Sequence, residues 1–282
     1  MFIARRSLII LLMLLVTVAG VAAYDSLSRR TLPPMPDESE TGYAEVNGIR
    51  MYYAIYSKGR GAPILMIHGG LGNSDVWSLQ VPELMKSHEV IVADSRGHGR
   101  STRTSEDLNY HLMAEDYVAL LDRLKLSQVA LVGWSDGAII GIDIALHHPE
   151  RLTKLFAHAA NVTPEGLFPD PPGPPIFPPN SPERLAYERL SPTPKEFDTF
   201  VAAVDKMWRT EPHYTTAQLN SIRVPTAVVV GQYDEAIRPE HSRYIAESIP
   251  NAQLIILKGL SHRAPIEDPA LYSKTIEDFL RS

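Results

Sequence analysis

Short, continuously apolar runs recur along the chain, and segments with helical spacing lie between them. Runs of this kind are typical of strands that are buried on both faces of a parallel sheet. They are ILMI (64–67), VIVA (90–93), VALV (129–132), KLFAH (154–158), TAVVVG (226–231) and QLIIL (253–257). Residues 110–124, 136–148 and 268–281 place apolar side chains at helical intervals. The pattern predicts an α/β fold with an open, doubly wound, mostly parallel sheet.

A β-hairpin is predicted ahead of these alternating units. The segments YAEVN and RMYYAIY flank Asn47-Gly48, and an Asn-Gly pair between β-rich runs is a strong hairpin signal. We therefore assign residues 43–162 and 225–282 to one α/β core.

Residues 163–224 interrupt the alternation and contain no convincing strand. Nine of the chain's 23 prolines fall within residues 164–182, a density that disfavours helix and sheet. Two amphipathic stretches follow, at 183–190 and 194–208. Too few residues remain for an independent core, so the segment is predicted to form a small lid over the main domain.

The first residues have the pattern of an export signal. Arg5 and Arg6 precede an apolar or small stretch that runs to Ala23, and Val21 and Ala23 are the small residues expected before a cleavage point. We expect residues 1–23 to be a signal peptide or an uncleaved N-terminal anchor, followed by a linker at 24–42. The protein would then be exported, as a periplasmic or secreted protein, or held at a membrane.

Composition narrows the possible functions. The net charge of -6 and the lack of a basic run give no support to a nucleic-acid-binding face. The absence of cysteine excludes disulfides, thiol nucleophiles, cysteine-based metal sites and a lipid-modified N-terminal cysteine. No HExxH or comparable motif occurs, so we expect neither a metal nor a cofactor. Nothing in the sequence indicates the oligomeric state.

The segment Gly-Trp-Ser-Asp-Gly at 133–137 follows a predicted strand and precedes a predicted helix. This is the setting of a nucleophile elbow, in which a sharp turn exposes a serine hydroxyl and flanking glycines let the strand and helix approach. We therefore predict that Ser135 is a catalytic nucleophile.

A serine nucleophile needs a base, and the base needs an orienting acid. Asp234 lies just beyond the strand predicted at 226–231, and His262 lies just past the last predicted strand. The carboxyl ends of parallel strands share one edge of a sheet, so these residues should meet at Ser135. Glu235 is the alternative acid, but it lies one residue further round the turn.

The oxyanion of an acyl-transfer intermediate needs two amide donors. We expect one from Asp136, the residue after the nucleophile, and one from Gly70 in the glycine-rich segment HGGLGNS (68–74). Leu71, Trp134 and the Asp136 carboxylate are candidate substrate-binding residues. His68 is expected to support this loop rather than to take part in catalysis.

Five segments together resemble the landmarks of the α/β-hydrolase superfamily, from about residue 43 to the end of the chain. They are HGGLGNSDVW, DSRGHGRS, GWSDGA, GQYDE and GLSHRAP. The segments GWSDG and HAANVTPEG are similar to the valacyclovir hydrolase (biphenyl hydrolase-like) group and to lactonases and esterases. In the valacyclovir hydrolase group the acid after the nucleophile helps to bind a substrate amino group, and Asp136 matches that position. The proline-rich stretch at 164–182 departs from the group's lid.

The expected activity is that of a serine hydrolase that cleaves a carboxylic ester of a small molecule through an acyl-enzyme. The same three residues could act on a lactone, a carbon-carbon bond or an aminoacyl ester, or as a cofactor-free perhydrolase or haloperoxidase. A non-catalytic ligand-binding homologue would usually lack one of the three residues, and none is missing here. Serine at 135 argues against dehalogenase and epoxide hydrolase chemistry, which uses aspartate there in similar folds.

Overall fold

A computed structural model describes residues 32–169 and 175–282 of the chain. Residues 33–282 form one compact unit. The predicted signal or anchor at 1–23 and residues 24–31 of the predicted linker lie outside the described residues. Within the described ranges, no helix is both long enough and apolar enough to span a membrane.

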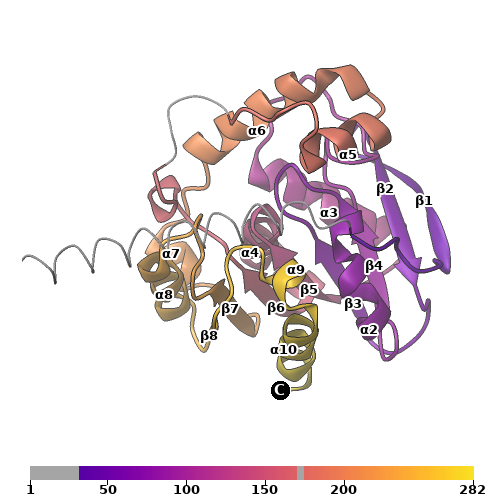
Figure 1. The fold of residues 1–282 in the computed structure, drawn as a ribbon. Coiled ribbons are helices and arrows are strands. Elements are labelled where there is room, and N and C mark those ends of the chain that lie inside the picture. Colours follow the sequence, from indigo (N-terminus) through magenta and orange to yellow (C-terminus); the bar gives the residue numbers. More distant parts are fainter. Residues whose placement is uncertain (1–31, 170–174) are drawn as a thin grey trace, which may run out of the picture. The chain divides into compact units, whose positions relative to one another are not determined.

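The fold is built on one eight-stranded sheet with the strand order β1-β2-β4-β3-β5-β6-β7-β8 (Figure 1). β1 and β2 pair as an antiparallel hairpin, β2 also pairs antiparallel with β4, and every later pair is parallel. The strands are β1 (Glu40–Val46), β2 (Ile49–Tyr56), β3 (Pro63–Ile67), β4 (Glu89–Ala93), β5 (Val129–Trp134), β6 (Leu152–His158), β7 (Thr226–Gly231) and β8 (Gln253–Leu257). The predicted α/β class and mostly parallel sheet are therefore confirmed.

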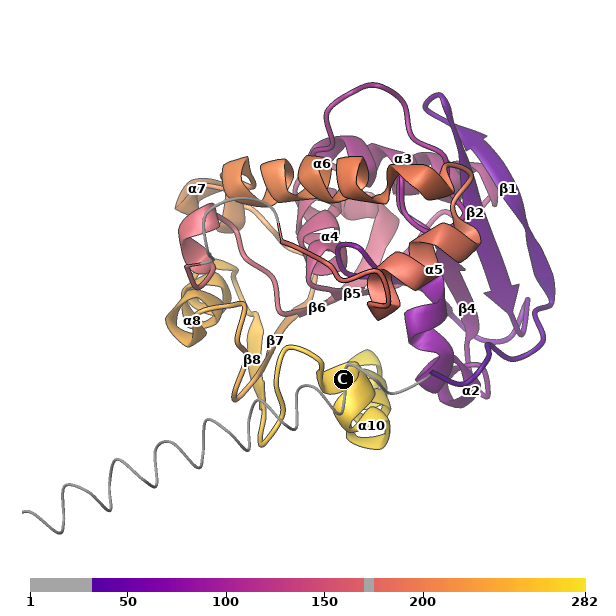
Figure 2. The ribbon, with the colours of Figure 1, turned by 45° about the horizontal axis from the view of Figure 1, so that its top comes forward.

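Helices follow the strands as the alternating pattern predicts. The α-helices are α2 (Val81–Leu84), α3 (Tyr110–Arg123), α4 (Asp136–His147), α5 (Pro182–Leu190), α6 (Phe197–Thr210), α7 (Thr216–Leu219), α8 (Pro239–Ser248), α9 (Ala264–Glu267) and α10 (Pro269–Arg281). Four 3-10 turns lie at Ser74–Leu79, Pro149–Arg151, Pro164–Gly166 and Pro194–Glu196. α3 packs on α4, and α10 packs on α2 (Figure 2).

One difference from the predicted pattern lies at the sheet edge. Most of the apolar runs fit strands that are buried on both faces, but in β8 Ile256 is 48% exposed and Gln253 is also exposed. β8 pairs on one side only, with β7, and so ends the sheet. An apolar run thus predicts a strand, but not whether neighbours cover it.

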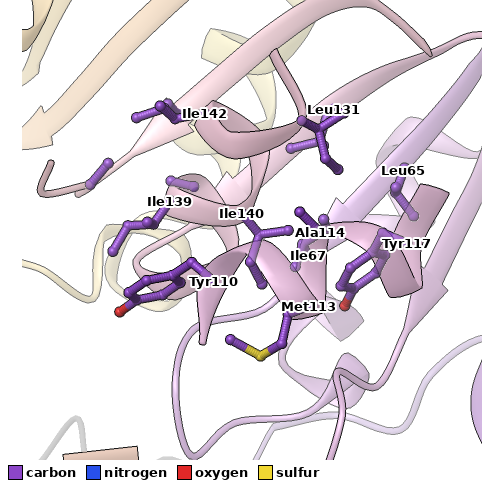
Figure 3. Close-up of a cluster of buried hydrophobic side chains, with 14 of the residues drawn as sticks. Leu65, Ile67, Tyr110, Met113, Ala114, Tyr117, Leu131, Ile139, Ile140 and Ile142 are labelled. Carbon is purple, nitrogen blue, oxygen red and sulfur yellow. The ribbon is translucent and has the colours of Figure 1, made fainter. Parts of the chain in front are cut away.

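A cluster of apolar side chains fixes α4 against the sheet (Figure 3). Leu65, Ile67 and Leu131 contribute from the strands, and Ile139 and Ile140 contribute from α4; all five are at most 1% exposed. Burying one such side chain contributes roughly 1.5–3 kcal/mol, so this face of α4 is held firmly. The turn that begins α4 is fixed with it.

The segment predicted to be a lid contains α5, α6 and α7, and Figure 1 shows α5 and α6 together at the top of the molecule. α6 buries Phe197, Phe200 and Val204 on one face. Tyr187 of α5 stacks on Phe200 with ring centroids 5.0 Å apart, and Phe200 meets the ring of His98 edge-on at 4.7 Å. Aromatic packing therefore joins the two lid helices to each other and to the core.

Candidate active site

Ser135 lies in a strained turn between β5 and α4. Its backbone has φ 55° and ψ -119°, a conformation that costs a non-glycine residue about 1–3 kcal/mol. The Ser135 amide donates to the His158 carbonyl at 2.8 Å, which holds the turn in place. A Cβ on Gly133 would overlap the Gly137 carbonyl, and one on Gly137 would overlap the Ile67 carbonyl. Only glycine fits at both positions, as the predicted elbow requires.

Buried Asp234 and half-buried His262 meet at the same edge of the sheet. The two oxygens of Asp234 lie 3.0 and 3.1 Å from Nδ1 of His262. Asp234 is 5% exposed, and its Oδ1 also accepts from the amides of Ala236 at 2.9 Å and Ile237 at 2.8 Å. The carboxylate is thus fixed before it orients the imidazole.

Charge and burial oppose each other in this pair, and charge prevails. Burial by itself would raise the pKa of Asp234, but the hydrogen bond and charge of His262 lower it below its usual value. Burial by itself would lower the pKa of His262, but the hydrogen bond and charge of Asp234 raise it above its usual value. His262 is therefore a stronger base than a free imidazole.

Two further groups hold the backbone of His262. Glu235 accepts from the His262 amide at 3.1 Å, so this alternative acid contacts the backbone rather than the ring. The indole Nε1 of Trp134 donates to the His262 carbonyl at 2.9 Å, and the two rings lie 6.0 Å apart. Trp134 directly precedes Ser135, so the nucleophile turn and the histidine loop are tied together.

The described residues make no hydrogen bond between Ser135 Oγ and His262. Such bonds are often long in a ligand-free enzyme and tighten when substrate binds. Ser135 follows β5 and His262 follows β8, so both residues lie at the carboxyl edge of the sheet.

The loop after β3 lies against Ser135. A Cβ built on Gly69 would lie 3.1 Å from Cβ of Ser135, and one on Gly70 would lie 2.5 Å from Oδ2 of Asp136. Nδ1 of His68 donates to the Gly69 carbonyl at 2.7 Å, and Nε2 accepts from the Ser95 amide at 3.0 Å. Burial lowers the pKa of His68, so the ring is neutral and supports the loop.

The Asp136 carboxylate joins α4 to α3 and α6. Its Oδ1 accepts from the Tyr110 hydroxyl at 3.0 Å, and Nε1 of Trp208 on α6 lies 2.9 and 3.0 Å from its two oxygens. Burial raises the pKa of Asp136 to about 6, while the hydrogen bonds from Trp208 and Tyr110 lower it by less. The group is buried, with 5% of its surface exposed.

Sequence reasoning did not identify Tyr110 or Trp208 as site residues. Both belong to amphipathic stretches that pack on the core, and nothing local distinguishes their polar atoms. The other predicted substrate-binding residues, Leu71 and Trp134, are 7% and 9% exposed. The only polar atom of the Trp134 side chain is already bonded to the His262 carbonyl, so Trp134 can offer a substrate only its ring.

These observations agree with the comparison with protein families, in which residues 62–209 match the alpha/beta hydrolase fold family. The match covers more than half of the chain. This protein belongs to the α/β-hydrolase fold family. The resemblance noted from the five sequence segments is thereby confirmed.

Several curated hydrolases are similar to this α/β hydrolase over most of its length. A 2-hydroxymuconate semialdehyde hydrolase of Pseudomonas sp. is 28% identical, over 80% of this chain and 89% of its own. 3-Oxoadipate enol-lactonase 2 of Acinetobacter baylyi is 25% identical, over 78% of this chain and 89% of its own. Serine hydrolase BPHL of Mus musculus is 25% identical, over 84% of each chain. The family match therefore supports a hydrolase activity for this chain, and the relatives named above act on different substrates.

Among solved structures, the enol-lactonase from Burkholderia xenovorans LB400 superposes with a TM-score of 0.68. The alignment covers 85% of this chain and all of the enol-lactonase, at 22% identity. At 22% identity this structural similarity supports the fold alone, and it is consistent with the sheet described above.

Proposed function

We propose that this α/β hydrolase cleaves a carboxylic ester of a small molecule through an acyl-enzyme. The observation that carries the proposal is the Asp234–His262 hydrogen bond at the sheet edge that presents Ser135. An oriented imidazole next to a serine on a strained turn is the arrangement that activates a hydroxyl for acyl transfer.

In the proposed reaction, Ser135 Oγ attacks the ester carbonyl while Nε2 of His262 takes its proton. The imidazolium then gives that proton to the leaving alcohol, and Asp234 stabilises the charged ring through Nδ1. Water, deprotonated by the same nitrogen, releases the acid. The amides of Gly70 and Asp136 are the proposed donors to the oxyanion; each such donor contributes roughly 3 kcal/mol in comparable sites.

The raised pKa of His262 sets the direction of the pH dependence. Hydrolysis requires the neutral imidazole, so the rate should fall as pH decreases through this pKa, which lies above the usual value for histidine.

The surroundings of Asp136 favour a neutral substrate over an aminoacyl ester. A carboxylate offers about four acceptor positions, and Trp208 and Tyr110 already make three contacts with this one. A substrate ammonium would have to compete with these donors for a group whose pKa of about 6 leaves it partly protonated in mildly acidic solution. We therefore propose that the carboxylate positions the lid tryptophan.

A lactone is the second candidate substrate. The likeness to an enol-lactonase over most of both chains favours it, and the same nucleophile, base and acid would open a cyclic ester. Ring opening keeps the leaving alkoxide in the acyl-enzyme, so the product is a single hydroxy acid.

The test is a panel of p-nitrophenyl esters of increasing chain length, assayed beside lactones and aminoacyl esters. Wild-type protein should turn over at least one neutral ester or lactone, and Ser135→Ala should lose that activity by several orders of magnitude. Ser221→Ala, which alters an exposed serine, is the matched control and should keep it. Wild-type turnover in Ser135→Ala would refute the proposed nucleophile, and a preference for aminoacyl esters would refute the proposed role of Asp136.

A further inference from the structure

Three side chains with metal-binding chemistry meet between α3 and α4, away from the strained turn at Ser135. His111 lies in the first turn of α3, and Asp143 and His147 lie one helical turn apart on α4. One ligand atom from each residue lies within 4.8 Å of the other two. Two imidazole nitrogens and one carboxylate oxygen are a donor set that suits zinc and other divalent transition metals.

The present geometry is close to that of a metal complex. Nδ1 of His111 lies 2.9 Å from Oδ1 of Asp143, and Nδ1 of His147 lies 3.1 Å from the same oxygen. A tetrahedral zinc with bonds of about 2.0–2.1 Å separates its ligand atoms by about 3.3 Å. The side chains of His111 and His147 are 56% and 41% exposed, so they have room for the small shift required.

The groups around the three ligands are those that support bound metals. Tyr214 donates its hydroxyl to Oδ2 of Asp143 at 2.8 Å, which leaves Oδ1 for the histidines. Oε1 of Glu115 lies 4.0 Å from Nε2 of His111. A histidine that binds metal through one nitrogen usually donates the other N–H to a carboxylate. Glu115 would have to accept it beside the contact that its Oε1 already makes with Nε2 of His148 at 2.6 Å.

Charge also favours a cation at this position. Without a metal, Nδ1 of both histidines faces Oδ1 of Asp143, Nδ1 of His147 also lies 3.0 Å from the Asp143 carbonyl, and the two rings lie 4.7 Å apart. A metal ion would replace both hydrogen bonds, with each hydrogen moving to Nε2. The carboxylates of Asp143 and Glu115 would offset a charge of +2.

We propose that His111, Asp143 and His147 form a binding site for a divalent transition-metal ion, zinc being the ion that best suits the donors. The remaining coordination positions face solvent and would hold water. The sequence shows no compact motif for this site, because His111 lies 32 residues before Asp143. The site lies outside the proposed hydrolytic machinery and would tie the start of α3 to the end of α4.

The test uses the full chain without a polyhistidine tag, first stripped with EDTA. Zinc binding is measured by calorimetry, and Co²⁺ is added as a probe because its visible absorption reports nitrogen and oxygen ligands. We expect one ion per chain. The pair of changes His111→Asn and His147→Asn should weaken zinc binding by about 100-fold or more, since loss of a supporting partner alone typically costs 10–100-fold.

The control is His88→Gln, which removes the imidazole of another histidine–carboxylate pair, with Nε2 of His88 3.5 Å from Glu277. This variant should bind zinc as the wild type does. His111→Asn alone changes an exposed side chain, and it tests the site if the double variant does not fold. The proposal is overturned if the wild type binds no zinc at millimolar concentration, or if folded His111→Asn keeps wild-type affinity.

Discussion

Replacing Asp136 with asparagine should change how the stability of the protein depends on pH. Burial raises the pKa of the Asp136 carboxyl from 3.8 to about 6 in the folded protein, and unfolding returns it to an ordinary value. Between these two values the folded state keeps a proton that the unfolded state has lost. The free energy of unfolding therefore falls as pH rises through this window.

The size of the effect follows from the shift. A difference of about 2.2 pKa units corresponds to about 3 kcal/mol at 1.36 kcal/mol per unit, and about 2 kcal/mol of this is lost between pH 4.5 and 7.5. Asparagine does not titrate, and its side-chain oxygen can still accept from Trp208 and Tyr110. Relative to wild type, Asp136→Asn should therefore become more stable by about 2 kcal/mol as pH rises from 4.5 to 7.5.

The assay is urea unfolding of both proteins at four pH values from 4.5 to 7.5, so that the titration of all other groups cancels in the difference. Asp107→Asn is the control, because Asp107 is an exposed carboxylate, 78% of whose side chain is accessible, that pairs with Lys206. A surface pair of this kind contributes about 0–1 kcal/mol, and the control difference should stay nearly constant. A difference between Asp136→Asn and wild type that is the same at pH 4.5 and 7.5 would refute the reasoning.

Two further predictions concern the proposed catalytic groups. Asp234→Asn should lower kcat by roughly 10⁴-fold, because it disturbs the tautomer of the His262 imidazole. Glu235→Gln keeps an acceptor for the His262 amide and should lower kcat by less than about tenfold. If steady-state kinetics showed the reverse order, Glu235 would be the acid. Gly70→Ala should lower kcat/KM by about 10²–10³-fold, because the new methyl group would lie 2.5 Å from Asp136. In the control Gly42→Ala, the nearest atom would lie 3.5 Å from the methyl group, so this variant should retain wild-type activity. Equal activity in the two variants would contradict the proposed position of the oxyanion loop.

The sheet could be predicted from sequence because its signals are local. Each of the six apolar runs lies at a strand from β3 to β8, and the Asn-Gly pair forms the turn between β1 and β2, with φ 42° at Asn47 and 77° at Gly48. Burial of β8 could not be predicted in the same way. It depends on which elements lie beside Ile256, and the run itself carries no information about its neighbours.

The placement of Ser135, Asp234 and His262 at one edge of the sheet could also be predicted, because the carboxyl ends of parallel strands share one edge whatever their separation in sequence. The contacts of the Asp136 carboxylate were not. Trp208 lies 72 residues from Asp136 and Tyr110 lies 26 residues from it, and separations of this length carry no sequence signal for a contact. The tryptophan belongs to an amphipathic helix whose packing on the core decides where the indole nitrogen points.

The Asp136 carboxylate links the position of α6 to protonation beside Ser135. The hydrogen bond from Trp208 lowers the pKa of Asp136, so a movement of α6 that breaks this bond would raise that pKa further and favour the protonated acid. By the same linkage, the ionised carboxylate favours the lid position in which Trp208 donates to it. The backbone of Asp136 also begins α4 directly after Ser135. Asp136 thus connects the strained turn at Ser135, the first turn of α3 and α6. If a substrate displaced Trp208, the buried Asp136 carboxylate would lose a hydrogen-bond donor, and the substrate would have to compensate for that loss.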